Sequence, residues 1–246
     1  MENAIYIPSS WNLPDSIRLR LRKTVGKQRL IREDDNLLLL PHAPPRAEDI
    51  EVRSAVVVWR DSAGEWKSFP VDGGLAGLEK HLILYRTAIH QLDDEVEFAK
   101  SARQYFEVMR HMHPLQRATR SMLDVLQNTR QALPADTRII TLRDMASDLE
   151  RAIELVAADA KAGMDFTLAE SANQQAISAE AANQEARRLN RLAAFFLPLA
   201  TLVAVFGMNP PEEIYLHPGF WVVLAAGLVL GLIVHGVVAL RNRKQE

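Results

Sequence analysis

Two apolar runs near the C-terminal end constrain the fold of this chain more than any other feature. Residues 220–240 contain no Asp, Glu, Lys or Arg over 21 positions, which is the length of a membrane-spanning helix. Residues 192–208 form a second uncharged run of 17 positions. Because backbone groups find no partners in hydrocarbon, both runs are expected to be helical, joined by an outer loop over 209–219. The sequence therefore predicts a helical hairpin in a lipid bilayer.

Basic residues flank both runs and predict their orientation. Lys and Arg concentrate on the cytoplasmic side of membrane helices, and the loop between the runs contains neither. We therefore expect both termini, including the basic tail 241–246, in the cytoplasm, with the hairpin in the cell inner (plasma) membrane. The start of the chain lacks the features of a cleaved signal peptide. The flanking basic residues are Arg187, Arg188, Arg191, Arg241, Arg243 and Lys244.

Composition excludes several functional classes. The chain has 246 residues, a formal net charge of −2 and no cysteine. Disulfides, thiolate zinc sites and cysteine nucleophiles are thus excluded, and the absence of a basic excess argues against a nucleic acid polymer as partner. We find no nucleophile–base pair, phosphate loop or paired acid motif, so an enzyme is not expected.

Residues 1–73 are expected to form a small sheet-containing cytoplasmic domain, scarcely large enough for its own core. Short apolar or alternating runs predict strands at 4–7, 35–40, 53–59 and 66–71. Residues 61–64, Asp-Ser-Ala-Gly, supply the turn of a hairpin.

The apolar period becomes helical after this domain. Residues 74–134 predict a cytoplasmic helical hairpin whose two helices are separated at Pro114. Between Pro134 and Pro198 there is no proline and only one glycine, Gly163, so residues 135–208 are expected to form one long stalk helix that continues into the first span at about 192–208. At about 1.5 Å per residue, the proline-free stretch alone would be about 95 Å long.

The stalk is acidic, and its lower part, residues 170–186, is polar on all sides. Residues 136–186 contain ten Asp or Glu against four Lys or Arg, a charge of −6. A helix this polar needs identical neighbours or a water-filled axis, and in a symmetric assembly its charge would attract cations. The alternative is that most of these charges form a solvated face.

The segment Gly207-Met208-Asn209 closes the first apolar run, and a Phe-Leu-Pro-Leu segment at 196–199 and the long stalk precede it. With this layout, the chain resembles the CorA family of divalent-cation channels over nearly its whole length. Residues 142–148 are similar to the stretch at the head of the family's stalk helix. The resemblance implies a mainly α membrane protein with a small N-terminal α/β domain, two C-terminal transmembrane helices and a homopentameric assembly.

The resemblance also implies roles for individual residues. Gly207, Met208 and Asn209 would form the ion-selectivity ring, where neutral amide oxygens hydrogen-bond a hydrated Mg²⁺ without trapping it. Asp148 would be a regulatory metal ligand through which cytoplasmic Mg²⁺ gates the channel, and Asp61 and Asp72 are candidates for a second such carboxylate. The implied pore-lining residues are Asn183, Ala186, Leu189 and Leu197.

The sequence of the outer loop does not decide which ion is transported. It reads Pro-Pro-Glu-Glu-Ile at 210–214, where the family usually has Met-Pro-Glu-Leu, which weakens the case for magnesium. Glu212 and Glu213 would concentrate cations at the outer mouth, or merely solubilise the loop. Zn²⁺, Co²⁺ and Ni²⁺ are alternative cargoes, as in a Zn²⁺-transporting relative. A membrane-tethered sensor, or a ligand-triggered channel of the nucleotide-activated, CRISPR-associated type, is the alternative from another functional class.

Overall fold

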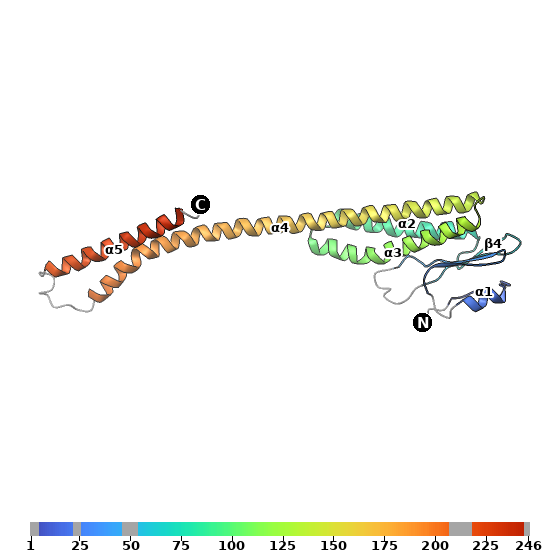
Figure 1. Cartoon of the computed structure of the whole chain (residues 1–246), viewed down its shortest axis with the longest axis horizontal. Helices are drawn as coiled ribbons and strands as arrows, with labels where there is room; N and C mark the ends of the chain where they lie inside the picture. The colour runs from blue at the N-terminus through green and yellow to red at the C-terminus, as the bar shows by residue number, and fades with distance from the viewer. Residues whose placement is uncertain (1–4, 22–25, 46–53, 207–217, 244–246) are drawn as a thin grey trace. The chain divides into compact units, whose positions relative to one another are not determined.

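The computed structural model describes residues 5–21, 26–45, 54–206 and 218–243. These fall into two compact units, Met1–Ala169 and Glu170–Glu246. Within the first unit, three helices run side by side and a small sheet with one short helix lies beside them (Figure 1). The fold is mainly helical with a small N-terminal sheet and one long helix, as the sequence predicts.

The sheet has four antiparallel strands in the order β1-β2-β3-β4. Two of its strands, β2 and β4, fall at predicted positions, and β3 lies at the end of the predicted 53–59 segment. The prediction of a strand at 4–7 is wrong for the described residues 5–7, which pair with no strand. Instead, Ile5 and Ile7 pack on a small apolar cluster below the sheet. The strands are β1 (Arg29–Glu33), β2 (Asn36–Leu40), β3 (Val57–Arg60) and β4 (Trp66–Phe69).

The β3–β4 connection is the predicted hairpin. The Asp61 carboxylate accepts a hydrogen bond from the Glu65 amide at 2.9 Å and pairs with the Lys67 ammonium at 3.2 Å. Gly64 adopts a φ of +89°, the left-handed conformation that glycine reaches without strain. These contacts also hold the pKa of Asp61 below its usual value, chiefly through the Glu65 amide.

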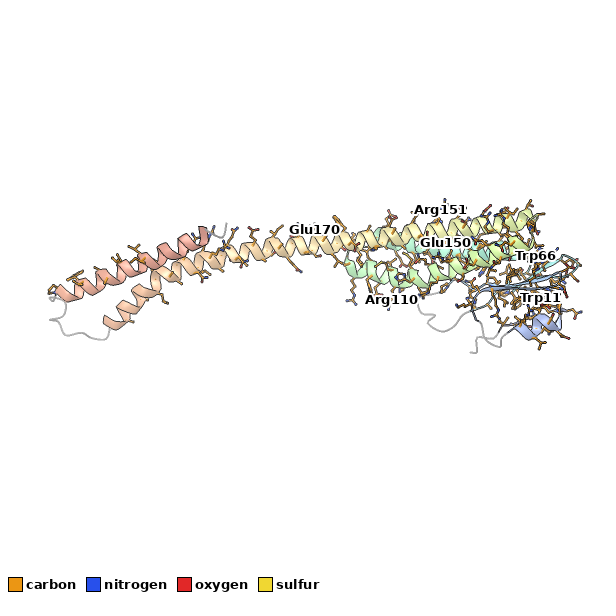
Figure 2. All side chains as sticks on the ribbon, viewed as in Figure 1. Trp11, Trp66, Arg110, Glu150, Arg151 and Glu170 are labelled. Carbon is orange, nitrogen blue, oxygen red and sulfur yellow. The ribbon has the colours of Figure 1, made fainter. Side chains whose placement is uncertain are left out.

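Both faces of the sheet are covered. Leu37, Leu39 and Val58 pack against the helices in the main core. Leu38 and Trp59 face the other side, where they meet the short helix α1 (Asp15–Arg20) and the preceding segment. The Trp59 ring lies 5.8 Å from the ring of Trp11, at a tilt of 34°, and Figure 2 labels Trp11 beside the sheet. Trp59 also donates a 3.3 Å hydrogen bond to Asn36. The sheet therefore shares one core with the helices.

Helices α2 (Leu75–Phe98) and α3 (Ala102–Ala132) form the helical hairpin, but the predicted break at Pro114 is wrong. Pro114 lies inside α3, and the chain breaks instead at 99–101. There the Ser101 hydroxyl accepts from the Gln104 amide, and the Gln104 side chain accepts from the Lys100 amide at 2.8 Å. Burial of Met112 and Leu115 on either side of Pro114 holds α3 together despite the lost backbone bond.

The third helix, α4 (Thr137–Phe206), is 70 residues long. Its first part buries residues at alternating spacings of three and four, the heptad pattern of helix-on-helix packing. Beyond Ala160 the described side chains of α4 are partly or fully exposed within this chain. The buried seam consists of Ile139, Leu142, Ala146, Leu149, Ile153, Val156 and Ala160.

The second unit contains the rest of α4 and α5 (Pro218–Arg243). The apolar run 220–240 lies within α5, and α4 includes residues 192–206 of the other run. Among the residues that the structure describes, no helix offers a stretch long and apolar enough to cross a membrane.

Candidate functional site

Asp148 lies in the first unit, on the side of α4 that faces away from the core. Its neighbours Ala146 and Leu149 are 0% and 4% exposed, whereas Asp148 is exposed. The heptad seam therefore fixes the direction in which this carboxylate points. Asp148 is therefore accessible from outside this chain.

The described residues contain no group of three His, Cys, Asp or Glu side chains that could hold a metal ion. Asp61 is occupied by its hairpin contacts, and Asp72 accepts a 2.8 Å bond from the adjacent Gly73 amide. One described chain therefore does not present a metal cage around Asp148, Asp61 or Asp72.

The four candidate pore residues all lie on the exposed second part of α4. At 100° per residue, Asn183, Ala186 and Leu197 fall within about 60° of one another, on one face of the helix. Leu189 lies further round, about 120° from Asn183. Leu189 and Leu197 are 65% and 69% exposed within this chain.

The remaining candidates lie outside the described residues. These are the Gly207-Met208-Asn209 segment and the two loop carboxylates, Glu212 and Glu213.

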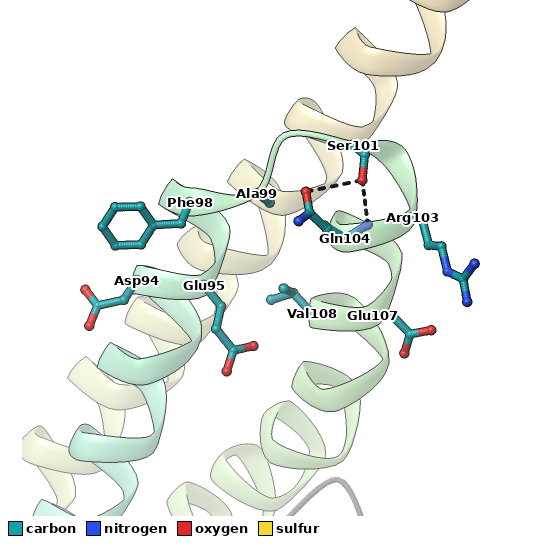
Figure 3. Close-up of a pocket in the computed structure, with 9 residues that line it drawn as sticks. All are labelled: Asp94, Glu95, Phe98, Ala99, Ser101, Arg103, Gln104, Glu107 and Val108. Atoms are coloured by element: carbon teal, nitrogen blue, oxygen red, sulfur yellow. Dashed lines mark hydrogen bonds between the residues drawn. The ribbon is translucent and has the colours of Figure 1, made fainter.

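A groove of about 610 Å³ opens between the end of α2 and the beginning of α3 (Figure 3). Glu95 and Val108 point into it, whereas Phe98 and Arg103 point outward on opposite sides. Glu107 pairs at 2.8 Å with Arg110, one turn further along α3. The groove has an apolar floor and an acidic rim. Its lining residues are Asp94, Glu95, Phe98, Ala99, Ser101, Arg103, Gln104, Glu107 and Val108.

A buried polar cluster joins α2 to the segment after β2, and sequence reasoning missed it. The His42 carbonyl accepts two bonds of 2.8 Å, one from the His81 ring and one from the Tyr85 hydroxyl. A carbonyl can only accept, so Nε2 of His81 carries the proton. Burial lowers the pKa of His81 to about 4 and raises that of Tyr85. His81 and Tyr85 lie four residues apart among apolar positions of α2, a spacing that places both on one face of the helix and indicates a structural role.

The comparisons with known proteins support the layout. The sequence model of the family described as CorA-like Mg²⁺ transporter protein matches residues 76–240. No curated protein sequence matches the chain. Among solved structures, the full-length CmaX protein is similar with a TM-score of 0.55 and 13% identity, covering 94% of this chain and 83% of CmaX. At this identity, the likeness concerns the fold alone.

Two further structures have lower TM-scores. The CorA magnesium transporter of Methanocaldococcus jannaschii has a TM-score of 0.46 and 17% identity. The match covers 86% of this chain and 78% of the transporter chain. The ZntB cytoplasmic domain of Vibrio parahaemolyticus has a TM-score of 0.41 and 12% identity, covering 66% and 80%. Because the family model spans well over half of the sequence, from α2 into α5, this chain belongs to the CorA-like Mg²⁺ transporter family.

Proposed function

We propose that this chain is the subunit of a homopentameric channel for divalent cations, with Mg²⁺ as its main cargo. The observation that carries the proposal is the family match over residues 76–240, which includes the two apolar runs and the Gly-Met-Asn segment that closes the first of them. In this proposal the end of α4 and most of α5 cross the inner membrane, and both termini are cytoplasmic.

An oligomer follows from the size of the membrane part. Two helices cannot enclose an aqueous path, so several copies must surround one. The second part of α4 supports this arrangement, because its described residues from 170 to 192 are all exposed within one chain. A helix that is polar on all sides gains no stability from an apolar face of its own, and identical copies around an axis would supply neighbours for it.

The proposed pore follows the face of α4 that carries Asn183, Ala186 and Leu197. A ring of Leu197 would form an apolar constriction that gates by excluding water. Leu189 lies about 60° round the helix from Ala186, so a second constriction at Leu189 would form at the edge of this face. At the outer end, five Asn209 amides would hydrogen-bond a hydrated Mg²⁺, which releases its waters reluctantly. A ring of carboxylates would bind a divalent ion more tightly and slow its release, so Glu212 and Glu213 are assigned to attraction of cations.

Regulation is assigned to Asp148. Because Asp148 points away from its own core and one described chain offers no cluster of three metal ligands, a neighbouring copy would supply the other ligands for regulatory Mg²⁺. Bound metal would offset repulsion among stalks that each carry −6 over residues 136–186. Loss of the metal would loosen the stalks and open the pore.

The test is metal uptake by proteoliposomes that contain an entrapped metal-sensitive dye. Mg²⁺, Zn²⁺, Co²⁺ and Ni²⁺ are compared for the native chain and for Asn209→Ala. The proposal expects Mg²⁺ uptake that is reduced in the variant. A preference for Zn²⁺ would assign the chain to zinc transport. No flux of any metal from an intact pentamer would favour the membrane-tethered sensor or the ligand-triggered channel.

A further inference from the structure

A second cavity, of about 410 Å³, lies where α3 ends and α4 begins, within the first unit. Four of its five lining residues carry hydrogen-bond donors, and none carries a carboxylate. Two of the donors are guanidinium groups and two are amides. The lining residues are Gln127, Arg130, Gln131, Pro134 and Arg143.

Arg143 contributes an unsatisfied donor to this region. Its Nε atom is buried and finds no acceptor among the described residues. The side chain is 23% exposed, and it forms a 2.8 Å ion pair with the neighbouring residue Asp144, which is itself 55% exposed. A buried polar atom without a partner is rare in proteins and calls for an explanation, such as an absent ion or water.

The nearby helix terminus does not supply an anion site by itself. The Asp136 carboxylate accepts bonds from the Arg138 and Ile139 amides and so occupies the first amides of α4. An anion in the cavity would therefore be held by side chains. Arg130 reaches it from the last turn of α3, and Arg143 from the second turn of α4.

From this arrangement we infer that the cavity binds a soluble phosphate monoester. Two guanidinium groups match the −1.5 to −2 charge that a phosphate monoester carries near pH 7, as a general property of the group, better than the single charge of a carboxylate. A guanidinium group can also donate two parallel hydrogen bonds to the oxygens of one phosphate. The cavity falls within the range of about 300–1,000 Å³ that is typical of small-molecule sites, which leaves room for the alcohol part of the ester.

Asp144 has a distinct place in this proposal, because it competes with the ligand for Arg143. Removal of its charge should therefore strengthen phosphate binding. A purely structural Arg143–Asp144 pair predicts no such gain. The effect makes Asp144→Asn the most informative variant.

The experiment is calorimetric titration of the full-length chain in detergent, without divalent metal, at fixed ionic strength. The probes are phenyl phosphate and benzoate. We expect phenyl phosphate to bind more tightly than benzoate, and Arg143→Gln to weaken it about tenfold or more, the usual cost of a lost charge-assisted hydrogen bond. Arg130→Gln, an exposed substitution that leaves the core untouched, should weaken it in the same direction. Asp144→Asn should tighten it.

The matched controls change the same charges elsewhere on α4. Arg151→Gln and Glu154→Gln alter exposed residues that do not line the cavity, and we expect both to leave phenyl phosphate binding unchanged. The proposal is overturned if no binding is measured, if benzoate binds as tightly, or if the cavity variants behave like the controls. Because the titration measures no transport, its failure and a failure of the proposed channel function are distinguishable.

Discussion

The Tyr105 ring of α3 lies directly against Gly163 of α4. A Cβ atom added at Gly163 would come within 2.5 Å of the ring carbons, well inside van der Waals contact. Gly163 follows Ala160, the last residue of the buried seam, by one turn. The single glycine in the proline-free stretch of α4 therefore lies against the first turn of α3, one turn beyond the buried seam.

Replacement of Gly163 by Ala should displace the Tyr105 ring. We expect a loss of about 1 kcal/mol in the free energy of unfolding, because overpacking outweighs the better helix propensity of alanine. In a Tyr105→Ala background the same change should instead stabilise by about 0.5–1 kcal/mol. Chemical denaturation of the four proteins in this cycle measures the coupling. Equal effects of Gly163→Ala in both backgrounds would contradict the contact.

His81 should make the stability of the protein depend on pH. Burial lowers its pKa in the folded chain to about 4, against about 6.5 when unfolded. Between these two pKa values the unfolded state binds a proton that the folded state does not. The free energy of unfolding is therefore highest above pH 6.5, as far as His81 is concerned, and decreases as the pH falls toward 4. The full effect is on the order of 3 kcal/mol.

The measurement for His81 is the unfolding free energy between pH 8 and pH 4.5. His81→Gln keeps a donor for the His42 carbonyl and should flatten this dependence. His90→Gln, which changes an exposed histidine on the same helix, should keep the native dependence. A native-like slope in His81→Gln would assign the effect to other groups.

The heptad seam of α4 predicts unequal costs for two leucines on the same helix. Leu149 is 4% exposed and Leu155 is 61% exposed. Leu149→Ala should lower the free energy of unfolding by about 2–5 kcal/mol, through lost burial and the cavity left behind. Leu155→Ala should change it by no more than about 0.5 kcal/mol. Urea denaturation of both variants in detergent makes the comparison, and similar losses would show that the seam is misassigned.

Asp148→Ala should leave metal uptake intact but make it less sensitive to Mg²⁺ on the cytoplasmic side. The reason is that the variant removes a carboxylate through which regulatory metal would hold the stalks together. Glu154→Gln changes an exposed acid on the same helix and serves as the control. Inhibition by Mg²⁺ that matches the native chain would remove Asp148 from the gating mechanism.

The fold was predictable where the local pattern is strong. The apolar residues of β2 and the proline-free composition of α4 predict their elements directly. The prediction of a helix break at Pro114 was wrong because burial of Met112 and Leu115 offsets the free energy that the proline costs the helix. The sequence does not reveal this packing. Strand β1 was not predicted from the sequence, because apolar and polar residues do not alternate regularly in its Arg-Leu-Ile-Arg-Glu segment. Its structure depends on pairing with β2.

The candidate sites were predictable to a lesser degree. The exposure of Asp148 follows from the seam residues beside it, which a heptad count would have found. The cavity beside Arg143 depends on how the end of α3 meets the beginning of α4. The His81 cluster depends on the carbonyl of His42, which is 39 residues away in the sequence. The sequence shows that His81 and Tyr85 share a face of α2, but it does not show which distant group that face meets.

The most direct test of the channel proposal is electrical. The native chain is placed in a planar bilayer under a Mg²⁺ gradient, after native mass measurement has established its oligomeric state. We expect a current whose reversal potential shifts by about 30 mV for each tenfold change in Mg²⁺ activity, the value for a divalent ion. An intact oligomer that passes no current, or a reversal potential that ignores the Mg²⁺ gradient, would contradict the proposal.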